Sequence, residues 1–187
     1  VRFAAKLGFR IEAQCEQPLF ELGDLLCGVP AARLFDEILK LFMGGTAVQS
    51  FEKLRHYDLF GKLFPQTERS LELEDHEFPI TFVARGLHNT DVRVREGKPV
   101  TPAFLFAVLL WEPVRLISER LIAAGELPMS AVLQAADEVL KAQVQRVAIP
   151  RRFSIAMREI WSMQHRFEQR TGKRPYRLVT HPRFRAA

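Results

Sequence analysis

Apolar residues recur along this chain at the three- and four-residue spacing of amphipathic helices. Between residues 33 and 42, for example, Leu34, Ile38 and Leu41 fall on one helical face. No run alternates apolar with β-branched residues, and neither Asn-Gly nor Asp-Gly occurs to close a hairpin. The pattern therefore predicts an all-α protein, a helical array without a sheet.

Glycine, proline and threonine divide this pattern into separate helices. Gly8 is expected to stop the first helix, and Pro30 suits a first helical turn, where a missing N–H costs no hydrogen bond. Thr46 and Thr101 precede two other helices as candidate N-caps. We expect helices over residues 1–7, 16–27, 30–42, 47–57, 79–91, 102–125 and 128–147, and again from residue 150 onward.

The degree of polarity separates buried from exposed segments. Residues 103–111 are almost entirely apolar, which predicts a central helix buried on most sides, and Pro113 is expected to kink it. Residues 66–77 form the most polar stretch and are expected to be a mobile loop. In the helix over 128–147, we expect the following side chains to face the core: Met129, Val132, Leu133, Ala136, Val139 and Leu140.

Charge is distributed unevenly between the two ends of the chain. The net charge is +5, yet residues 141–187 alone contain 12 Lys and Arg against 2 Asp and Glu. A basic segment beside an acidic remainder is typical of a protein that binds a polyanion, and the planar fork of arginine suits phosphate. Tyr176, which lies amid this charge, is the best candidate to stack on a base. The candidate RNA-binding residues are Arg151, Arg152, Arg158, Arg166, Arg170, Lys173, Arg174, Arg177, Arg183 and Arg185.

The sequence carries no recognisable metal site or complete active site. Cys15 and Cys27 have no further ligand at metal-binding spacing, so we expect two buried free thiols in a reducing cytoplasm. The five histidines are scattered, and no phosphate-binding glycine loop or nucleophile elbow occurs. No segment reaches the roughly 20 apolar residues of a membrane helix.

Several strings, taken in order, resemble one enzyme family. Residues 1–9 (VRFAAKLGF) and 30–42 (PAARLFDEILKLF) resemble the end of the arginine-rich helix and the neck helix of class II nucleotidyltransferases. That family includes the bacterial poly(A) polymerases and the tRNA CCA-adding enzymes. The strings that resemble the poly(A) polymerase branch are residues 89–94 (NTDVRV), 101–107 (TPAFLFA), 149–153 (IPRRF), 157–161 (MREIW), 172–174 (GKR) and 181–187 (HPRFRAA).

The resemblance implies an architecture and an activity. Residues 1–65 would be a neck domain, and residues 66–187 a body domain whose arginine-rich RNA-binding segment begins near 149. A catalytic head absent from this chain would bind Mg²⁺ and ATP and add AMP to RNA 3′ ends, so this chain alone would be inactive. Arg2 matches the last arginine of the family's helix and becomes a candidate for the wall of the nucleotide pocket. The implied partners are RNA 3′ ends of almost any sequence, and RNA-decay or RNA-chaperone proteins, in the cytoplasm.

Two other interpretations remain open at this point. The chain could be part of a CCA-adding enzyme, whose full-length form would stop after a fixed triplet instead of adding many adenylates. It could also be a non-enzymatic helical adaptor that binds RNA, in which case no catalytic domain would precede Val1.

Overall fold

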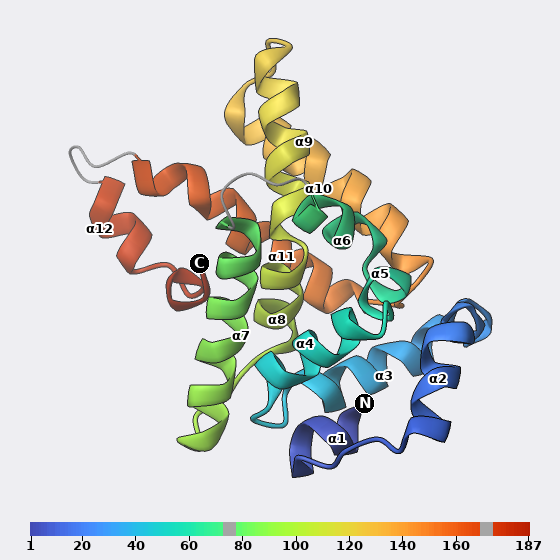
Figure 1. The fold of residues 1–187 in the computed structure, drawn as a ribbon. Coiled ribbons are helices and arrows are strands. Elements are labelled where there is room, and N and C mark those ends of the chain that lie inside the picture. Colours follow the sequence, from blue (N-terminus) through green and yellow to red (C-terminus); the bar gives the residue numbers. More distant parts are fainter. Residues whose placement is uncertain (73–77, 169–173) are drawn as a thin grey trace.

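A computed structural model describes residues 1–72, 78–168 and 174–187 of the chain. Over these ranges all the regular elements are helices and none is a strand, which confirms the all-α prediction (Figure 1). The elements are α1 (Arg2–Leu7), α2 (Ala13–Glu21), η1 (Gly23–Gly28), α3 (Ala31–Phe42), α4 (Ala47–His56), α5 (Phe60–Leu63), α6 (Pro65–Glu72), α7 (Phe78–Arg95), α8 (Pro102–Leu109), α9 (Trp111–Ala123), α10 (Pro128–Val144), α11 (Arg151–Gln164), η2 (His165–Glu168), α12 (Arg174–Val179) and η3 (Phe184–Ala186).

Several helix ends are set by local residue chemistry, as predicted. Gly8 adopts a left-handed conformation with φ of 67° and ends α1, a conformation that costs glycine little. At the start of α8, the Thr101 hydroxyl accepts a hydrogen bond from the Phe104 N–H at 3.3 Å, and Pro102 occupies the first turn. Pro30 directly precedes α3. These boundaries are confirmed because each depends only on neighbouring residues.

The α8 helix lies at the centre of the molecule, as predicted. Leu105, Phe106 and Leu109 are fully buried, and the Phe106 ring stacks on Phe35 of α3 with 5.5 Å between the ring centroids. On another side, the Trp161 indole N–H of α11 donates to the Ala107 carbonyl at 3.0 Å. A single hydrophobic core therefore extends from α3 to α11.

The chain does not continue past α8 as one kinked helix. The backbone leaves helical geometry at Leu110 (φ −105°, ψ 7°), and Pro113 then lies in the first turn of a separate helix, α9. Because proline has no N–H, it cannot donate to the Leu109 carbonyl four residues earlier. The buried Thr67 hydroxyl donates to that carbonyl instead, at 2.8 Å.

The prediction of a loop over residues 66–77 is wrong for residues 66–72. Residues 66–72 belong to α6, whose Thr67, Ser70 and Leu71 are buried, while residues 73–77 lie outside the described residues. These three residues form the inner face of α6, Arg69 and Glu72 are exposed, and the half-buried Glu68 pairs with Arg55 at 2.8 Å. A high content of charged residues is therefore compatible with an amphipathic helix as well as with a loop.

Two of the residues expected inside α10 are exposed. Met129 and Leu133 have exposed fractions of 39% and 40%, whereas Val132, Ala136, Val139 and Leu140 are buried as predicted. The α9–α10 hairpin extends away from the other helices (Figure 1), and α9 is the helix that packs most extensively on α10. Ala131 and Ala135 are fully buried instead, so the buried face of α10 is rotated toward these two alanines.

The N-terminal segment also differs from expectation. The helix expected over 16–27 ends at Glu21, and η1 follows it. Cys15 and Cys27 are exposed free thiols, not buried ones. No residue of α2 is buried, because few elements pack on this end of the chain.

One cap is made by a distant residue. Thr46 precedes α4 but makes no side-chain cap hydrogen bond. The buried Asp91 carboxylate of α7 instead accepts hydrogen bonds from the Ala47 N–H at 2.6 Å and the Val48 N–H at 3.1 Å. Asp91 lies within α7 because this helix continues to Arg95, beyond the predicted end at residue 91. Of the helices that the structure describes, none is both long and apolar enough to cross a membrane.

Candidate nucleic-acid interface

The first turn of α11 presents two adjacent arginines. Arg151 and Arg152 follow Pro150 directly, and both are exposed. The Arg152 guanidinium lies 4.7 Å from the centroid of the Phe153 ring, a contact with the ring face that orients the group. Cations at a helix N-terminus oppose the helix dipole by about 0.3–1 kcal/mol each. Helix stability therefore does not explain this pair, whereas an anionic ligand at the same place would.

Two of the expected RNA-binding arginines are held by carboxylates. The Arg158 Nη2 lies 2.6 Å from the Asp137 carboxylate of α10, and the Arg183 Nε lies 3.1 Å from that of Glu159 on α11. These ion pairs tie α11 to α10 and the C-terminal segment to α11. The seven- and eight-residue spacing of Arg151, Arg158 and Arg166 predicts one shared helical face, but Arg158 is turned toward α10.

The other expected residues are spread over the C-terminal elements. Arg166 is half-buried in η2, whereas Arg177 of α12 and Arg185 of η3 are exposed. Tyr176 has an exposed fraction of 75%, which leaves its ring accessible for stacking. Arg170 and Lys173 lie outside the described residues, and the structure describes the Arg174 backbone at the start of α12 but not its side chain.

A groove brings the C-terminal arginines against α7. Arg93, Arg183 and Arg185 line this cavity of about 600 Å³, which we call the arginine groove. The Arg93 guanidinium donates through Nε and Nη2 to the Pro99 carbonyl, at 3.3 and 3.0 Å, and is held there. Arg93 was not among the predicted RNA-binding residues, because the helix that carries it was expected to end at residue 91. The four-residue spacing of Arg85, Asn89 and Arg93 is the signal that indicates a shared helical face.

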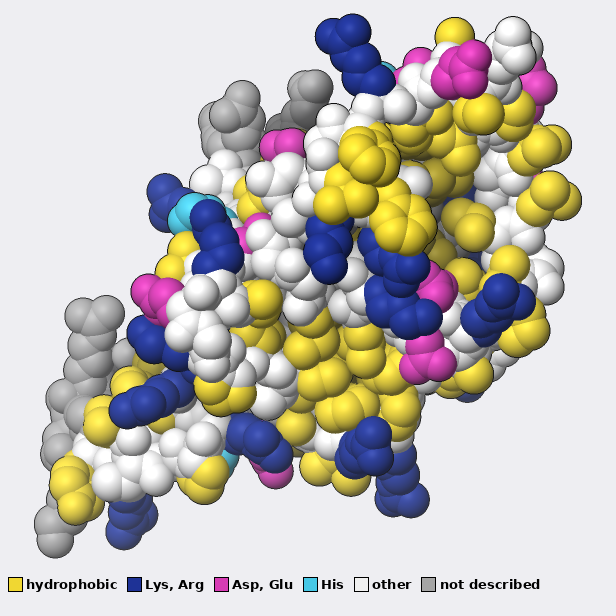
Figure 2. Space-filling view, turned by 90° about the horizontal axis from the view of Figure 1, so that it is seen from below, with side chains coloured by type: hydrophobic (Ala, Val, Ile, Leu, Met, Phe, Trp, Pro, Cys, Tyr) yellow, Lys and Arg dark blue, Asp and Glu magenta, His cyan; other side chains and the backbone are white. Residues whose placement is uncertain are grey.

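The basic side chains do not merge into one strip. Figure 2 shows Lys and Arg side chains placed around a central apolar area on the face seen from below. A flexible polyanion can contact such separated charges in turn, whereas a rigid anionic surface would need them in register.

Arg2 lies in a different cavity, near the start of the chain. Its Nη1 is 3.6 Å from the Glu37 carboxylate of α3, and both residues line a cavity of about 560 Å³ together with Arg33. A hydrogen bond from the Lys40 ammonium lowers the pKa of the Glu37 carboxyl, and the charges of Lys40, Arg2 and Arg33 lower it further against a partial burial that raises it. Glu37 is thus kept ionised beside Arg2.

Comparison with known proteins identifies the family. Residues 124–187 match a family model described as the polymerase A arginine-rich C-terminus. Residues 8–71 match a second one, described as a probable RNA and SrmB-binding site of polymerase A. Proteins named poly(A) polymerase I are similar over the whole chain, with 39% identity in Salmonella typhi and 40% in Haemophilus influenzae. The chain belongs to the bacterial poly(A) polymerase family.

The poly(A) polymerase match confirms the resemblance, and the matched segments include the predicted RNA-binding residues. The arginine-rich model covers all ten residues predicted to bind RNA. The chain spans about 40% of the length of these two poly(A) polymerase I relatives, 40% and 41% respectively. Among the described residues, no group of three His, Cys, Asp or Glu side chains is placed to hold a metal ion.

Proposed function

We propose that this chain is the RNA-binding neck and body of a bacterial poly(A) polymerase. One observation carries the proposal. In the part of the chain that the structure describes, Arg151, Arg152, Arg177 and Arg185 are exposed and have no acidic partner, and all four fall within the segment matched by the arginine-rich family model. Exposed guanidinium groups without an acidic partner can form charge-assisted hydrogen bonds with phosphate oxygens.

In this proposal, AMP transfer and RNA binding take place in different parts of the full-length enzyme. The full-length enzyme adds AMP from ATP to RNA 3′ ends, with Mg²⁺ and ATP bound by a catalytic head outside this chain, so this chain alone is inactive. Residues 1–65 form the neck, where Arg2 borders the nucleotide pocket. Residues 66–187 form the body, which holds the RNA backbone. Phosphate contacts carry no base information, which suits a substrate with many different 3′ ends.

The setting of this activity follows from the same proposal. We place the enzyme in the cytoplasm, where RNA 3′ ends are available. RNA-decay or RNA-chaperone proteins as partners stay a prediction.

A pair of charge-removing variants tests the proposal. Arg151→Gln with Arg152→Gln removes two exposed cations of α11, and we expect labelled single-stranded RNA to bind roughly 30-fold more weakly, about 1 kcal/mol for each lost phosphate contact. Fluorescence anisotropy measures the affinity. Lys6→Gln with Arg10→Gln is the matched control, because it removes the same charge from exposed positions near the N-terminus. Equal affinities for the two double variants would contradict the proposal.

A further inference from the structure

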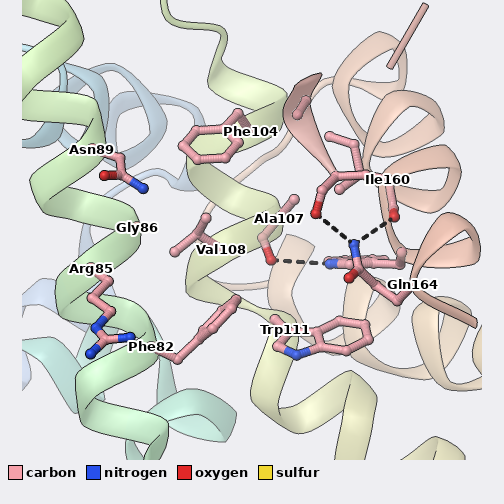
Figure 3. Close-up of a pocket in the computed structure, with 13 residues that line it drawn as sticks. Phe82, Arg85, Gly86, Asn89, Phe104, Ala107, Val108, Trp111, Ile160 and Gln164 are labelled. Atoms are coloured by element: carbon pink, nitrogen blue, oxygen red, sulfur yellow. Dashed lines mark hydrogen bonds between the residues drawn. The ribbon is translucent and has the colours of Figure 1, made fainter. Parts of the chain in front are cut away.

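A cleft lined by aromatic side chains opens between α7, α8 and α11. Its volume is about 310 Å³, which lies within the range of about 300–1,000 Å³ of small-molecule sites. Phe82 of α7, Phe104 of α8 and Trp111 of α9 stand around the opening, with the Asn89 amide beside Phe104 (Figure 3). We call it the aromatic cleft. The rings of Phe82, Phe104 and Trp111 are partly exposed, so they are accessible to a ligand.

The back wall of the aromatic cleft is rigid. Gly86 brings α7 so close to α8 that a Cβ added there would lie 2.4 Å from Val108 Cγ1. On the opposite side, the hydrogen bond from the Trp161 indole to the Ala107 carbonyl fixes α11 against α8. The cleft is thus bounded by closely packed helices, and a flat ligand would bind without first ordering its walls.

The aromatic cleft and the arginine groove adjoin each other. Asn89, Phe104, Ala186 and Ala187 line both cavities. Arg85 lines the cleft, and Arg93 and Arg185 line the groove. None of the described side chains that line either cavity is acidic. An apolar slot therefore continues into a positively charged channel, the arrangement that a base and its flanking phosphates require.

We propose that the aromatic cleft takes one unstacked base of a single-stranded RNA, while neighbouring phosphates lie on Arg93 and Arg185 in the arginine groove. The inference rests on the proposed function, since it assumes that the chain binds RNA. It places a contact in residues 72–123, which lie between the two matched family segments. Stacking accepts any base, because each base has a π-face. A duplex, whose bases are already stacked, would not enter.

The tryptophans of the chain provide a direct readout. The chain has only two, and both Trp111 and Trp161 line the aromatic cleft. We expect unlabelled single-stranded oligoadenylate to change the tryptophan fluorescence of the 187-residue chain, and a blunt RNA duplex of equal length to leave it unchanged. Anisotropy of labelled oligoadenylate measures total binding in parallel.

Substitution of Phe104 tests the base contact itself. Phe104→Leu keeps an apolar side chain but removes the ring, and we expect it to weaken single-strand binding roughly 5- to 150-fold, the range of one lost base stack. Phe9→Leu is the control, since Phe9 is exposed and lines neither cavity. Circular dichroism checks the fold. If Phe104→Leu does not fold, Asn89→Ala at an exposed position replaces it, with an expected loss of roughly fivefold.

The outcomes separate this inference from the proposed function. If oligoadenylate binds in the anisotropy assay, but tryptophan fluorescence is unchanged and the Phe104 or Asn89 variant binds like the Phe9 control, the cleft is not a base site and the proposed function stands. If oligoadenylate does not bind at all, the proposed function fails and this inference fails with it.

Discussion

Single polar side chains inside this helical array form hydrogen bonds with backbone N–H and carbonyl groups that have no partner within their own helix. Asp91 of α7 caps α4, and the Thr67 hydroxyl donates to the Leu109 carbonyl, to which Pro113 has no N–H to donate. The Thr101 cap was predictable, because its partner lies three residues away. The caps made by Asp91 and Thr67 were not, because they join residues 44 and 42 positions apart, and only the packed fold brings them together.

Removal of the Asp91 carboxylate should destabilise the fold. Asp91→Ala leaves the N–H groups of Ala47 and Val48 without an acceptor in a buried place, and we expect a loss of about 2 kcal/mol in the free energy of unfolding. Urea denaturation followed by circular dichroism measures it. Asp36→Ala, at an exposed position of α3, serves as the control and should cost less than about 0.5 kcal/mol. An Asp91→Ala midpoint equal to that of the control would show that the cap contributes nothing.

Whole helices were predicted best where apolar spacing and end signals agreed. The α3 and α8 helices meet both conditions, and their burial is as expected. The α6 helix was not predicted, because its high content of charged residues is also typical of a loop. The α7 helix was predicted to end at residue 91, although it continues to Arg95. Exposure near the tip of the α9–α10 hairpin depends on which helices cover it, and the sequence of α10 does not contain that information.

The close approach of α7 and α8 leads to a prediction at Gly86. Alanine favours a helix over glycine by about 1 kcal/mol, yet its Cβ would collide with the stiff, β-branched side chain of Val108. We expect Gly86→Ala to lower the free energy of unfolding by about 1–3 kcal/mol, as overpacked cores do. Thermal denaturation measures the change.

A double variant and a control isolate the collision. Gly86→Ala combined with Val108→Ala makes room for the added methyl group, so its loss should be smaller than the two single losses together. Gly28→Ala adds a Cβ where no atom lies within 4 Å, and it should not destabilise. Strict additivity of the Gly86 and Val108 effects would mean that the two helices adjust without strain.

At the scale of the whole molecule, the position of the basic segment was predictable but the state of each arginine was not. Composition identified residues 141–187 as basic. Asp137 and Glu159 form ion pairs with Arg158 and Arg183, and only the folded structure shows these pairs. Arg93 joins the interface for the same reason, since α7 and the C-terminal segment meet only in three dimensions. The basic segment therefore presents separate cationic positions, with Arg151 and Arg152 at the start of α11 and Arg185 at the arginine groove.

The salt dependence of RNA binding reports how many of these arginines contact the RNA backbone. If Arg151, Arg152, Arg177 and Arg185 each neutralise one phosphate of a single strand, log K should fall with log salt at a slope of about −3, a loss of about 50-fold between 50 and 200 mM salt. Anisotropy titrations of labelled single-stranded RNA across that range give the slope. A slope near zero would contradict the account, because these arginines would then not contact the RNA backbone.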